Sequence, residues 1–280
     1  MMVDELIRLT SGKINPKMHA NLWNGSIIWH NYNTSWHVAV LPFIEQSALY
    51  AKFPFTPGPP TVANGYAGTD MVNYTIPGGP LLRQVKLPYL RCPTDSTDEM
   101  LSSAFQASYS GSLGSQATVS ANGSCNQFQQ FAQKPGDHGN IALQSELSGI
   151  FTRVGQGCKL NQVTDGLSNT IFVGEVLMKC TDHSGGGWIH FNNGANAHAS
   201  TVCPINDMTT CPPGTGKITN PSCTAQNNWN YSWGFKSQHP GGAQFLLGDG
   251  SARFLGDTIN HQTYQRLGGK ADGLVIGSDF

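Results

Sequence analysis

The sequence predicts an α+β fold, in which a short N-terminal helix packs on an antiparallel β-sheet with long irregular loops. Two Asp-Gly pairs, Asp165-Gly166 and Asp249-Gly250, each adjoin a run rich in β-branched and aromatic residues, which is typical of turns that lead into strands. Residues 1–16 space their apolar side chains as in an amphipathic helix and end in glycine and proline.

Further elements follow in chain order. A second helical stretch after a proline carries apolar residues on one face, namely Phe43, Ile44, Ala48 and Leu49. Residues 54–80 are rich in proline and glycine and predict a loop. A last short helix is expected in TINHQTYQRLGGK, ended by its glycines. The chain has no internal repeat and no linker, so we expect one domain over residues 1–280.

Short strands are predicted in five segments. They are VKLPYLRCPTD, the stretch around Ser108 and Tyr109, the stretch that begins at Ile150 and Phe151, the run from Thr170 to Val173, and GGGWIHF. Residues 191–232, which are rich in Asn, Gly, Thr and Pro, predict a long irregular excursion.

The segment HPGGAQFLLGDGSARFLGD, residues 239–257, predicts a β-hairpin closed by a two-residue type I′ turn. Its apolar residues alternate on the two sides of that turn, as in a half-buried antiparallel pair: Ala243, Phe245, Leu247, Ala252 and Phe254. The residues that shape the turns are His239, Pro240, Gly241, Gly242, Asp249 and Gly250. We interpret these residues, with Asp165 and Gly166, as structural rather than catalytic.

Charge is sparse in this chain. Asp, Glu, Lys and Arg make up 12% of the 280 residues, about half the usual quarter for a soluble domain, and the net charge is −1. No basic run is present, so the sequence gives no electrostatic basis for nucleic-acid binding. A polar surface built from Asn, Gln, Ser, Thr and 33 glycines favours an extracellular protein. Neither a signal peptide nor a membrane span is recognisable.

The seven cysteines form no CxxC pair, which argues against zinc knuckles and thioredoxin-like chemistry. Four of them lie in a stretch with few apolar residues, where disulfides would supply the missing constraint. Seven is odd, so at least one thiol is left over, and inert buried thiols are the alternative for the others. The disulfide candidates are Cys92, Cys125, Cys158, Cys180, Cys203, Cys211 and Cys223.

Five blocks, in order along nearly the whole chain, resemble the planctomycete-type DUF1559 family of pilin-like and pseudopilin-like proteins. They are SWHVAVLPFIEQSALY, LRCPTD, SYSGS, VTDGLSNTIFVGE and HPGGAQFLLGDGSARFL. Proteins of that family begin with a prepilin cleavage and methylation segment and a long hydrophobic helix. The resemblance implies a pilin-like head, with residues 1–16 as the remnant of the helix, and we expect the anchoring part of that helix to be missing.

Calcium is the one cation that the resemblance implies, since secreted pseudopilins can hold it in a loop rich in Asp. The densest acidic cluster supplies Asp95, Asp98 and Glu99, without the ladder of an EF-hand. Three histidines share a Gly/Asn-rich stretch, but their spacing matches no zinc motif. We interpret them as loop residues: His183, His190 and His198.

Catalysis is not expected. SYSGSLGS does not fit a GxSxG nucleophile elbow, and an enzyme would have to use Glu175, His239 and Asp249, which all adjoin turns. Aromatic residues in or beside the 191–232 excursion offer another function, because Trp and Tyr rings stack on sugars, although they also form satellite cores. They are Trp188, Trp229, Tyr231 and Trp233.

We therefore expect a non-enzymatic structural subunit of a cell-surface or extracellular filament, which acts by contact with copies of itself. The low charge suits this function because it keeps repulsion between neighbouring copies small. The alternative is a secreted module that binds surface glycans through its Trp/Tyr-rich loops. Self-association predicts broad contact surfaces, glycan binding an exposed aromatic platform, and an enzyme a concave site with converging carboxylates.

Overall fold

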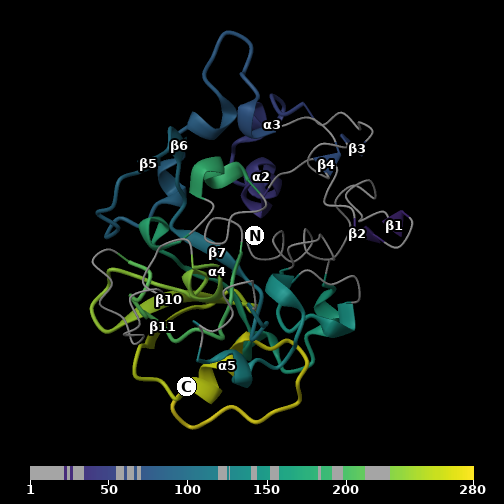
Figure 1. The fold of residues 1–280 in the computed structure, drawn as a ribbon, viewed down its shortest axis with the longest axis vertical. Helices are drawn as coiled ribbons and strands as arrows, with labels where there is room; N and C mark the ends of the chain where they lie inside the picture. The colour runs from purple at the N-terminus through teal and green to yellow at the C-terminus, as the bar shows by residue number, and fades with distance from the viewer. Residues whose placement is uncertain are drawn as a thin grey trace.

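A computed structural model shows a largely helical and irregular part above a β-sheet (Figure 1). We call this part, which is built mainly from residues 35–54, 71–105 and 184–190, the upper half. None of its described helices has the length and apolar character needed to span a bilayer. The predicted N-terminal helix, residues 1–16, lies outside the described residues. Those residues are 35–54, 71–118, 125, 127–139, 144–151, 158–181, 184–190, 198–211 and 228–280, with the short strands at 22–23, 26–27, 60–61 and 66–67.

The central element is a five-stranded mixed sheet in the order β11-β10-β8-β7-β9. β7 and β9 pair in parallel and the other neighbours antiparallel, so the prediction of an antiparallel sheet is wrong at the β9 edge, while the α+β class is confirmed. The five strands are β7 (Tyr109–Ser112), β8 (Ile171–Glu175), β9 (His198–Ala199), β10 (Gly242–Leu247) and β11 (Ala252–Gly256).

The remaining elements are short. Three two-stranded pairs are β1 (Leu22–Trp23) with β2 (Ser26–Ile27), β3 (Pro60–Thr61) with β4 (Tyr66–Ala67), and β5 (Met100–Leu101) with β6 (Ala104–Phe105). The α-helices are α2 (Trp36–Val40), α3 (Ser47–Tyr50), α4 (Trp229–Ser232) and α5 (His261–Gly268). The 3-10 helices are η2 (Leu41–Phe43), η3 (Met71–Asn73), η4 (Leu82–Gln84), η5 (Pro88–Leu90), η7 (Gln129–Phe131), η8 (Asp137–Gly139), η9 (Gln144–Glu146), η10 (Leu160–Gln162), η11 (Leu167–Asn169), η12 (Met178–Cys180) and η13 (Ser184–Ile189).

The C-terminal helix α5 confirms its prediction. The side-chain oxygen of Asn260 accepts hydrogen bonds from the backbone N–H groups of Gln262 and Thr263, which satisfies two donors that a helix start leaves open. Tyr264 and Leu267 are fully buried and belong to a core cluster that includes Phe245 of β10. The helix therefore covers one face of the sheet.

The central strand β8 is buried on both faces. The face under α5 includes Ile171 of β8, whereas Phe172 and Val173 of the same strand pack with Ile150 and Phe151 on a separate cluster. A further cluster fills the upper half and surrounds the fully buried Trp188. The site described below lies where the upper half meets the sheet.

The hairpin of β10 and β11 forms, but its turn differs from the prediction. The Leu247 N–H donates to the Ser251 carbonyl and the register pairs Leu246 with Ala252, so the loop has three residues and Gly250 takes the positive φ of 91°. The extra residue shifts the pairing by one and exchanges the two faces of β11. Leu255 is buried in place of Phe254, which is 46% exposed.

Three other predicted elements do not form as expected, because of their local backbone geometry. VKLPYLRCPTD forms the 3-10 helix η5 instead of a strand, because Pro88 fixes its first turn. GGGWIHF forms η13, in which Gly187 has a φ of 63° that interrupts strand geometry. The helix expected over residues 43–49 is broken by Glu45 at a φ of 61°. The strand expected at Ile150 and Phe151 is not assigned as one.

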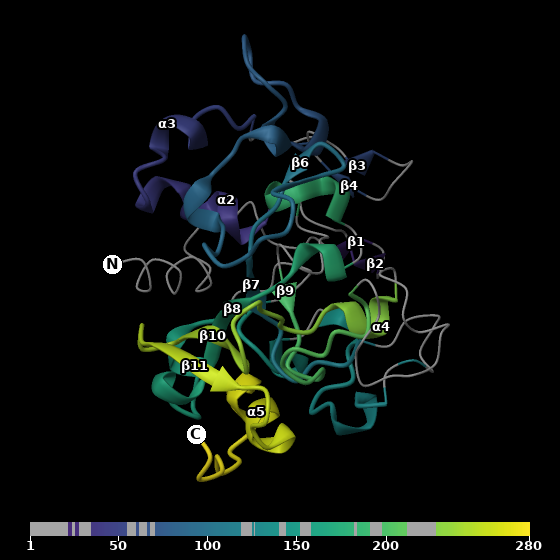
Figure 2. The same cartoon turned by 90° about the vertical axis from the view of Figure 1, so that its left-hand side faces the viewer.

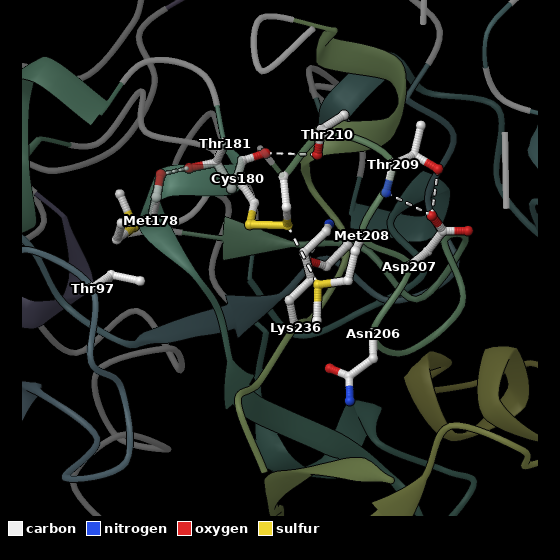
Figure 3. The surroundings of a disulfide bond; sticks show 12 residues. Thr97, Met178, Cys180, Thr181, Asn206, Asp207, Met208, Thr209, Thr210 and Lys236 are labelled. Carbon is white, nitrogen blue, oxygen red and sulfur yellow. Dashed lines mark hydrogen bonds between the residues drawn. A yellow bond between two sulfur atoms is a disulfide. The ribbon is translucent and has the colours of Figure 1, made fainter. Parts of the chain in front are cut away.

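The predicted excursion over residues 191–232 contains strand β9 and helix α4, and its residues 199–205 are buried. A disulfide ties Cys211 of this segment to Cys180, and the Thr210 hydroxyl donates to the Cys180 carbonyl (Figure 3). Cys125 is also disulfide-bonded. The prediction of disulfides is wrong for three candidates, Cys92, Cys158 and Cys203, which are buried thiols. Cys223 lies outside the described residues.

His37 makes the stability of the fold depend on pH. Its ring is fully buried, 3.0 Å from the Tyr109 carbonyl oxygen, and burial lowers its pKa to about 3. An unfolded chain protonates this histidine near pH 6.5, so stability is lost as pH falls from about 6.5 toward 3, at about 1.4 kcal/mol per pH unit. We expect His37→Gln to remove this slope, measured by urea unfolding at pH 7 and pH 5. Equal slopes in the two proteins would contradict the account.

Candidate functional site

Three side chains from distant parts of the chain converge where the upper half meets the sheet. Cys92 follows η5, Glu175 ends β8, and His239 precedes β10. Their ligand atoms all lie within 4.8 Å of one another, and among the described residues this is the one such cluster of three His, Cys, Asp or Glu side chains. We call it the Cys-Glu-His cluster.

The cluster is centred on one nitrogen atom. The Nε2 atom of His239 lies 3.3 Å from the Oε1 atom of Glu175, 3.7 Å from the Sγ atom of Cys92, and 3.3 Å from the Oγ1 atom of Thr94. A nucleophile triad needs the thiol and the carboxylate on opposite nitrogens of the ring, so that the carboxylate orients the base. Here the Sγ atom of Cys92 and the Oε1 atom of Glu175 both approach the same nitrogen, Nε2 of His239.

The backbone around the cluster is fixed by local contacts. The second carboxylate oxygen of Glu175 accepts a 2.7 Å hydrogen bond from the Gln244 N–H, and the His239 N–H donates to the Ser237 hydroxyl. Gly241 has a φ of 79°, which confirms the predicted tight entry into β10. The hollow beside the cluster has a cavity volume of about 0 Å³, compared with 300–1,000 Å³ for small-molecule sites.

Burial dominates the electrostatics near the cluster. It raises the pKa of Tyr109 to about 12, and the charges of Cys92 and Glu175 act in the same direction. It lowers the pKa of the fully buried Lys236, whose Nζ atom donates to the Gly234 carbonyl and not to the cluster. The site therefore combines two potential anions with little solvent.

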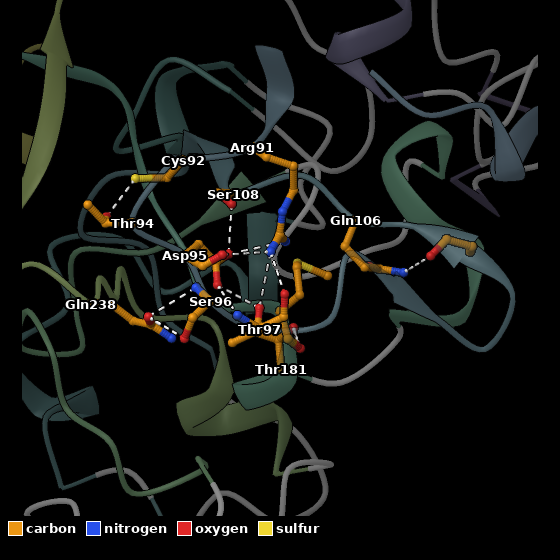
Figure 4. Close-up of polar contacts among 12 residues, drawn as sticks. Arg91, Cys92, Thr94, Asp95, Ser96, Thr97, Gln106, Ser108, Thr181 and Gln238 are labelled. Atoms are coloured by element: carbon orange, nitrogen blue, oxygen red, sulfur yellow. Dashed lines mark hydrogen bonds and ion pairs between the residues drawn. The ribbon is translucent and has the colours of Figure 1, made fainter. Parts of the chain in front are cut away.

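Beside the cluster, Arg91 and Asp95 form a buried ion pair with 3.1 Å between Nη1 and Oδ2 (Figure 4). Asp95 also accepts hydrogen bonds from Ser108 and Thr97, so its oxygens are already satisfied. The predicted calcium cluster does not assemble, since Glu99 instead pairs with Lys86 at the surface and Asp98 is exposed.

The predicted aromatic platform is wrong for the residues whose side chains are described. Trp188, Tyr231 and Trp233 are at most 1% exposed, because they form core contacts that include the packing of Trp188 against Phe53. The side chain of Trp229 lies outside the described residues. The satellite-core interpretation therefore holds for this group.

The remaining predicted site residues separate into turns and loops. Asp165 lies in a turn and accepts hydrogen bonds from the N–H groups of Asp272 and Gly273, while Gly166 has a φ of 97°. Asp249 is exposed in the hairpin loop, where it bonds Ser251, so it does not join Glu175 and His239. His190 lies at the end of η13, His198 is buried in β9, and His183 is outside the described residues.

A second feature is the open edge of the sheet at β11, which Figure 2 shows as the outermost strand. The Asp257 N–H donates to the Gly241 carbonyl, so Asp257 faces β10. In an antiparallel pair, successive residues point their backbone N–H and C=O groups alternately toward and away from the partner strand. Ala252, Phe254 and Gly256 therefore point theirs away from β10. The Phe254 ring is 46% exposed and lies over Gly242 of β10. We call these three residues the β11 edge.

The sequence indicates Cys92 only as a disulfide candidate and not as a member of a site. A signal was present, since each member of the Cys-Glu-His cluster occurs in a different one of the five blocks, LRCPTD, VTDGLSNTIFVGE and HPGGAQFLLGDGSARFL. A family model described as "Protein of unknown function (DUF1559)" matches residues 14–262. No curated protein and no solved structure matches the chain.

Proposed function

The chain belongs to the DUF1559 family, and on this premise we propose that it is a non-enzymatic structural subunit that pairs with a second copy of itself through the β11 edge. The pair would be the unit of a filament or pilus-like assembly at the cell surface or outside the cell. The observation that carries the proposal is that β11 pairs with no strand beyond β10 among the described residues, with Phe254 46% exposed on it. Of the outward backbone groups, the Gly256 carbonyl already accepts from the Ile259 N–H, which leaves Ala252 and Phe254 for a second copy. Natural proteins usually blunt or cover such an edge.

The chemistry of the edge fits a second copy of the chain. In an antiparallel pairing about a two-fold axis, Phe254 lies opposite Phe254 of the second copy, and Ala252 lies opposite Gly256. No charged side chain faces a like charge in this register, and Arg253 already lies over the Phe280 ring at 4.8 Å. The disulfide between Cys180 and Cys211 supports an oxidising, extracellular location.

Two features of the Cys-Glu-His cluster support the non-enzymatic part of the proposal. The thiol and the carboxylate share one nitrogen of His239, which is unsuited to a relay. The hollow at the cluster is also small for a substrate.

Phe254→Lys is expected to weaken self-association about tenfold or more. The ring is 46% exposed, so the substitution removes about 0.7–1.4 kcal/mol of ring burial on pairing, and it also places two lysines opposite each other. Sedimentation velocity across a concentration series measures the effect, and circular dichroism checks that the fold is kept.

The matched control for this experiment is Phe43→Lys. Phe43 is 41% exposed, compared with 46% for Phe254, and it lies in η2 between α2 and α3, outside the central sheet. Self-association should be unchanged in this variant. Equal sedimentation of all three proteins would refute pairing through the β11 edge.

A further inference from the structure

We propose that the Cys-Glu-His cluster is a binding site for a zinc ion, with the Sγ atom of Cys92, the Nε2 atom of His239 and a carboxylate oxygen of Glu175 as ligands. These are the three donor types that zinc takes in proteins. The site is separate from the β11 edge and does not depend on the proposed self-pairing.

Two of the three separations between donor atoms match tetrahedral coordination, and the third, between Sγ of Cys92 and a Glu175 oxygen, is at most 4.8 Å. Zn–S bonds of about 2.3 Å and Zn–N or Zn–O bonds of about 2.0–2.1 Å place S and N about 3.6 Å apart and N and O about 3.3 Å apart. The observed distances from Nε2 of His239 are 3.7 Å to Sγ of Cys92 and 3.3 Å to Oε1 of Glu175. An ion between these atoms therefore needs only small side-chain movements.

The Cys92 thiol has the Thr94 hydroxyl as a hydrogen-bond partner at 3.0 Å, but hydrogen bonding does not account for the number of groups around the His239 nitrogen. Nε2 of a neutral imidazole offers either one N–H or one lone pair, yet three heteroatoms lie within 3.7 Å of it. A cation bound to that lone pair, to the thiolate and to the carboxylate satisfies all three groups at once. The Thr94 hydroxyl or a water molecule would complete the tetrahedron.

The charges near the cluster also favour a bound cation. Glu175 and Cys92 are buried, and a thiolate beside a carboxylate would carry two negative charges. The neighbouring cations are directed elsewhere, since Arg91 pairs with Asp95 and Lys236 donates to Gly234. A divalent ion balances the two charges, and the partly exposed His239 ring gives it a route from solvent.

Zinc at this position joins three segments that are distant in sequence. The loop after η5, the end of β8 and the entry to β10 each supply one ligand. The Glu175 ligand is already oriented by the Gln244 N–H, the type of outer contact that fixes metal-binding carboxylates. Binding would therefore fasten the upper half to the sheet.

The test is metal binding by the full chain, purified without a histidine tag and stripped with a chelator. Zinc is titrated in competition with a chromophoric chelator, and Co²⁺ is used as a spectroscopic probe of thiolate coordination. The variants are Cys92→Ser and His239→Gln, with Cys158→Ser as the control because Cys158 is also a buried thiol. His239 is partly exposed, so its variant should fold even if Cys92→Ser does not.

We expect the wild type and Cys158→Ser to bind one zinc ion per chain and to give a thiolate-to-cobalt charge-transfer band. Cys92→Ser and His239→Gln should bind more than about 100-fold more weakly, since even loss of an outer-shell partner costs 10–100-fold. The proposal is overturned if the wild type takes up no zinc, or if His239→Gln binds it with unchanged affinity.

Discussion

Replacing Arg91 with alanine is expected to lower the free energy of unfolding by about 3–5 kcal/mol, the cost of leaving one member of a buried ion pair without its partner. Asp95 is 2% exposed at its side chain, and Arg91 also donates to the Thr97 carbonyl oxygen at 2.8 Å. Asp95 in turn accepts from Ser108, the residue before β7. The pair therefore connects the segment after η5 to the central sheet.

Urea unfolding measures this effect, and the chain provides a surface pair for comparison. Lys86 and Glu99 are 56% and 48% exposed, so Lys86→Ala should cost less than about 1 kcal/mol. Adding Asp95→Asn to Arg91→Ala should restore part of the loss, because the unpaired charge is then gone. Similar losses for Arg91→Ala and Lys86→Ala would contradict a buried pair.

Removing the disulfide with Cys180→Ala and Cys211→Ala is expected to cost about 3–4 kcal/mol. The bridge closes a loop of 31 residues. Without it the unfolded chain gains conformational entropy, which lowers the free energy of unfolding by about 3–4 kcal/mol for a loop of this length. The segment also depends on the bridge for packing, since the Sδ atom of Met208 lies 3.4 Å from the Sγ atom of Cys211. Thermal and urea unfolding of the double variant measure the loss.

Cys158→Ala provides the comparison for the disulfide, because it removes one buried sulfur without opening a loop. Its loss should be several-fold smaller than that of the double variant. A double variant as stable as the wild type would show that the loop is held by its packing alone.

The sequence predicted local features well where side-chain pattern and turn chemistry act together. The strand over residues 171–175 and the helix over residues 261–268 form as expected. The hairpin shows the limit of this reasoning. Gly248 joins Asp249 and Gly250 in the loop, and this one added residue sends Leu255 to the core and Phe254 to the surface. The exposed Phe254 at the β11 edge follows from that register and could not be read from apolar alternation.

Long-range placement accounts for the other differences. Trp188, Tyr231 and Trp233 lie in polar segments, but the fold buries them, and local composition carries no information on that outcome. The sequence relates Glu175 to His239 only as a possible catalytic pair. The contact of His239 with Cys92 spans 147 residues of sequence and depends on how η5 packs against the sheet.

Cross-linking of Phe254→Cys is the most direct test of pairing through the β11 edge. In the proposed register this residue lies opposite its own copy, about 5.5 Å away between Cα atoms, within the range of a disulfide. Mild oxidation followed by non-reducing electrophoresis and peptide mass spectrometry should give a 254–254 linked dimer, while Phe43→Cys should stay monomeric. A monomeric Phe254→Cys protein, or equal cross-linking of both variants, would contradict the account.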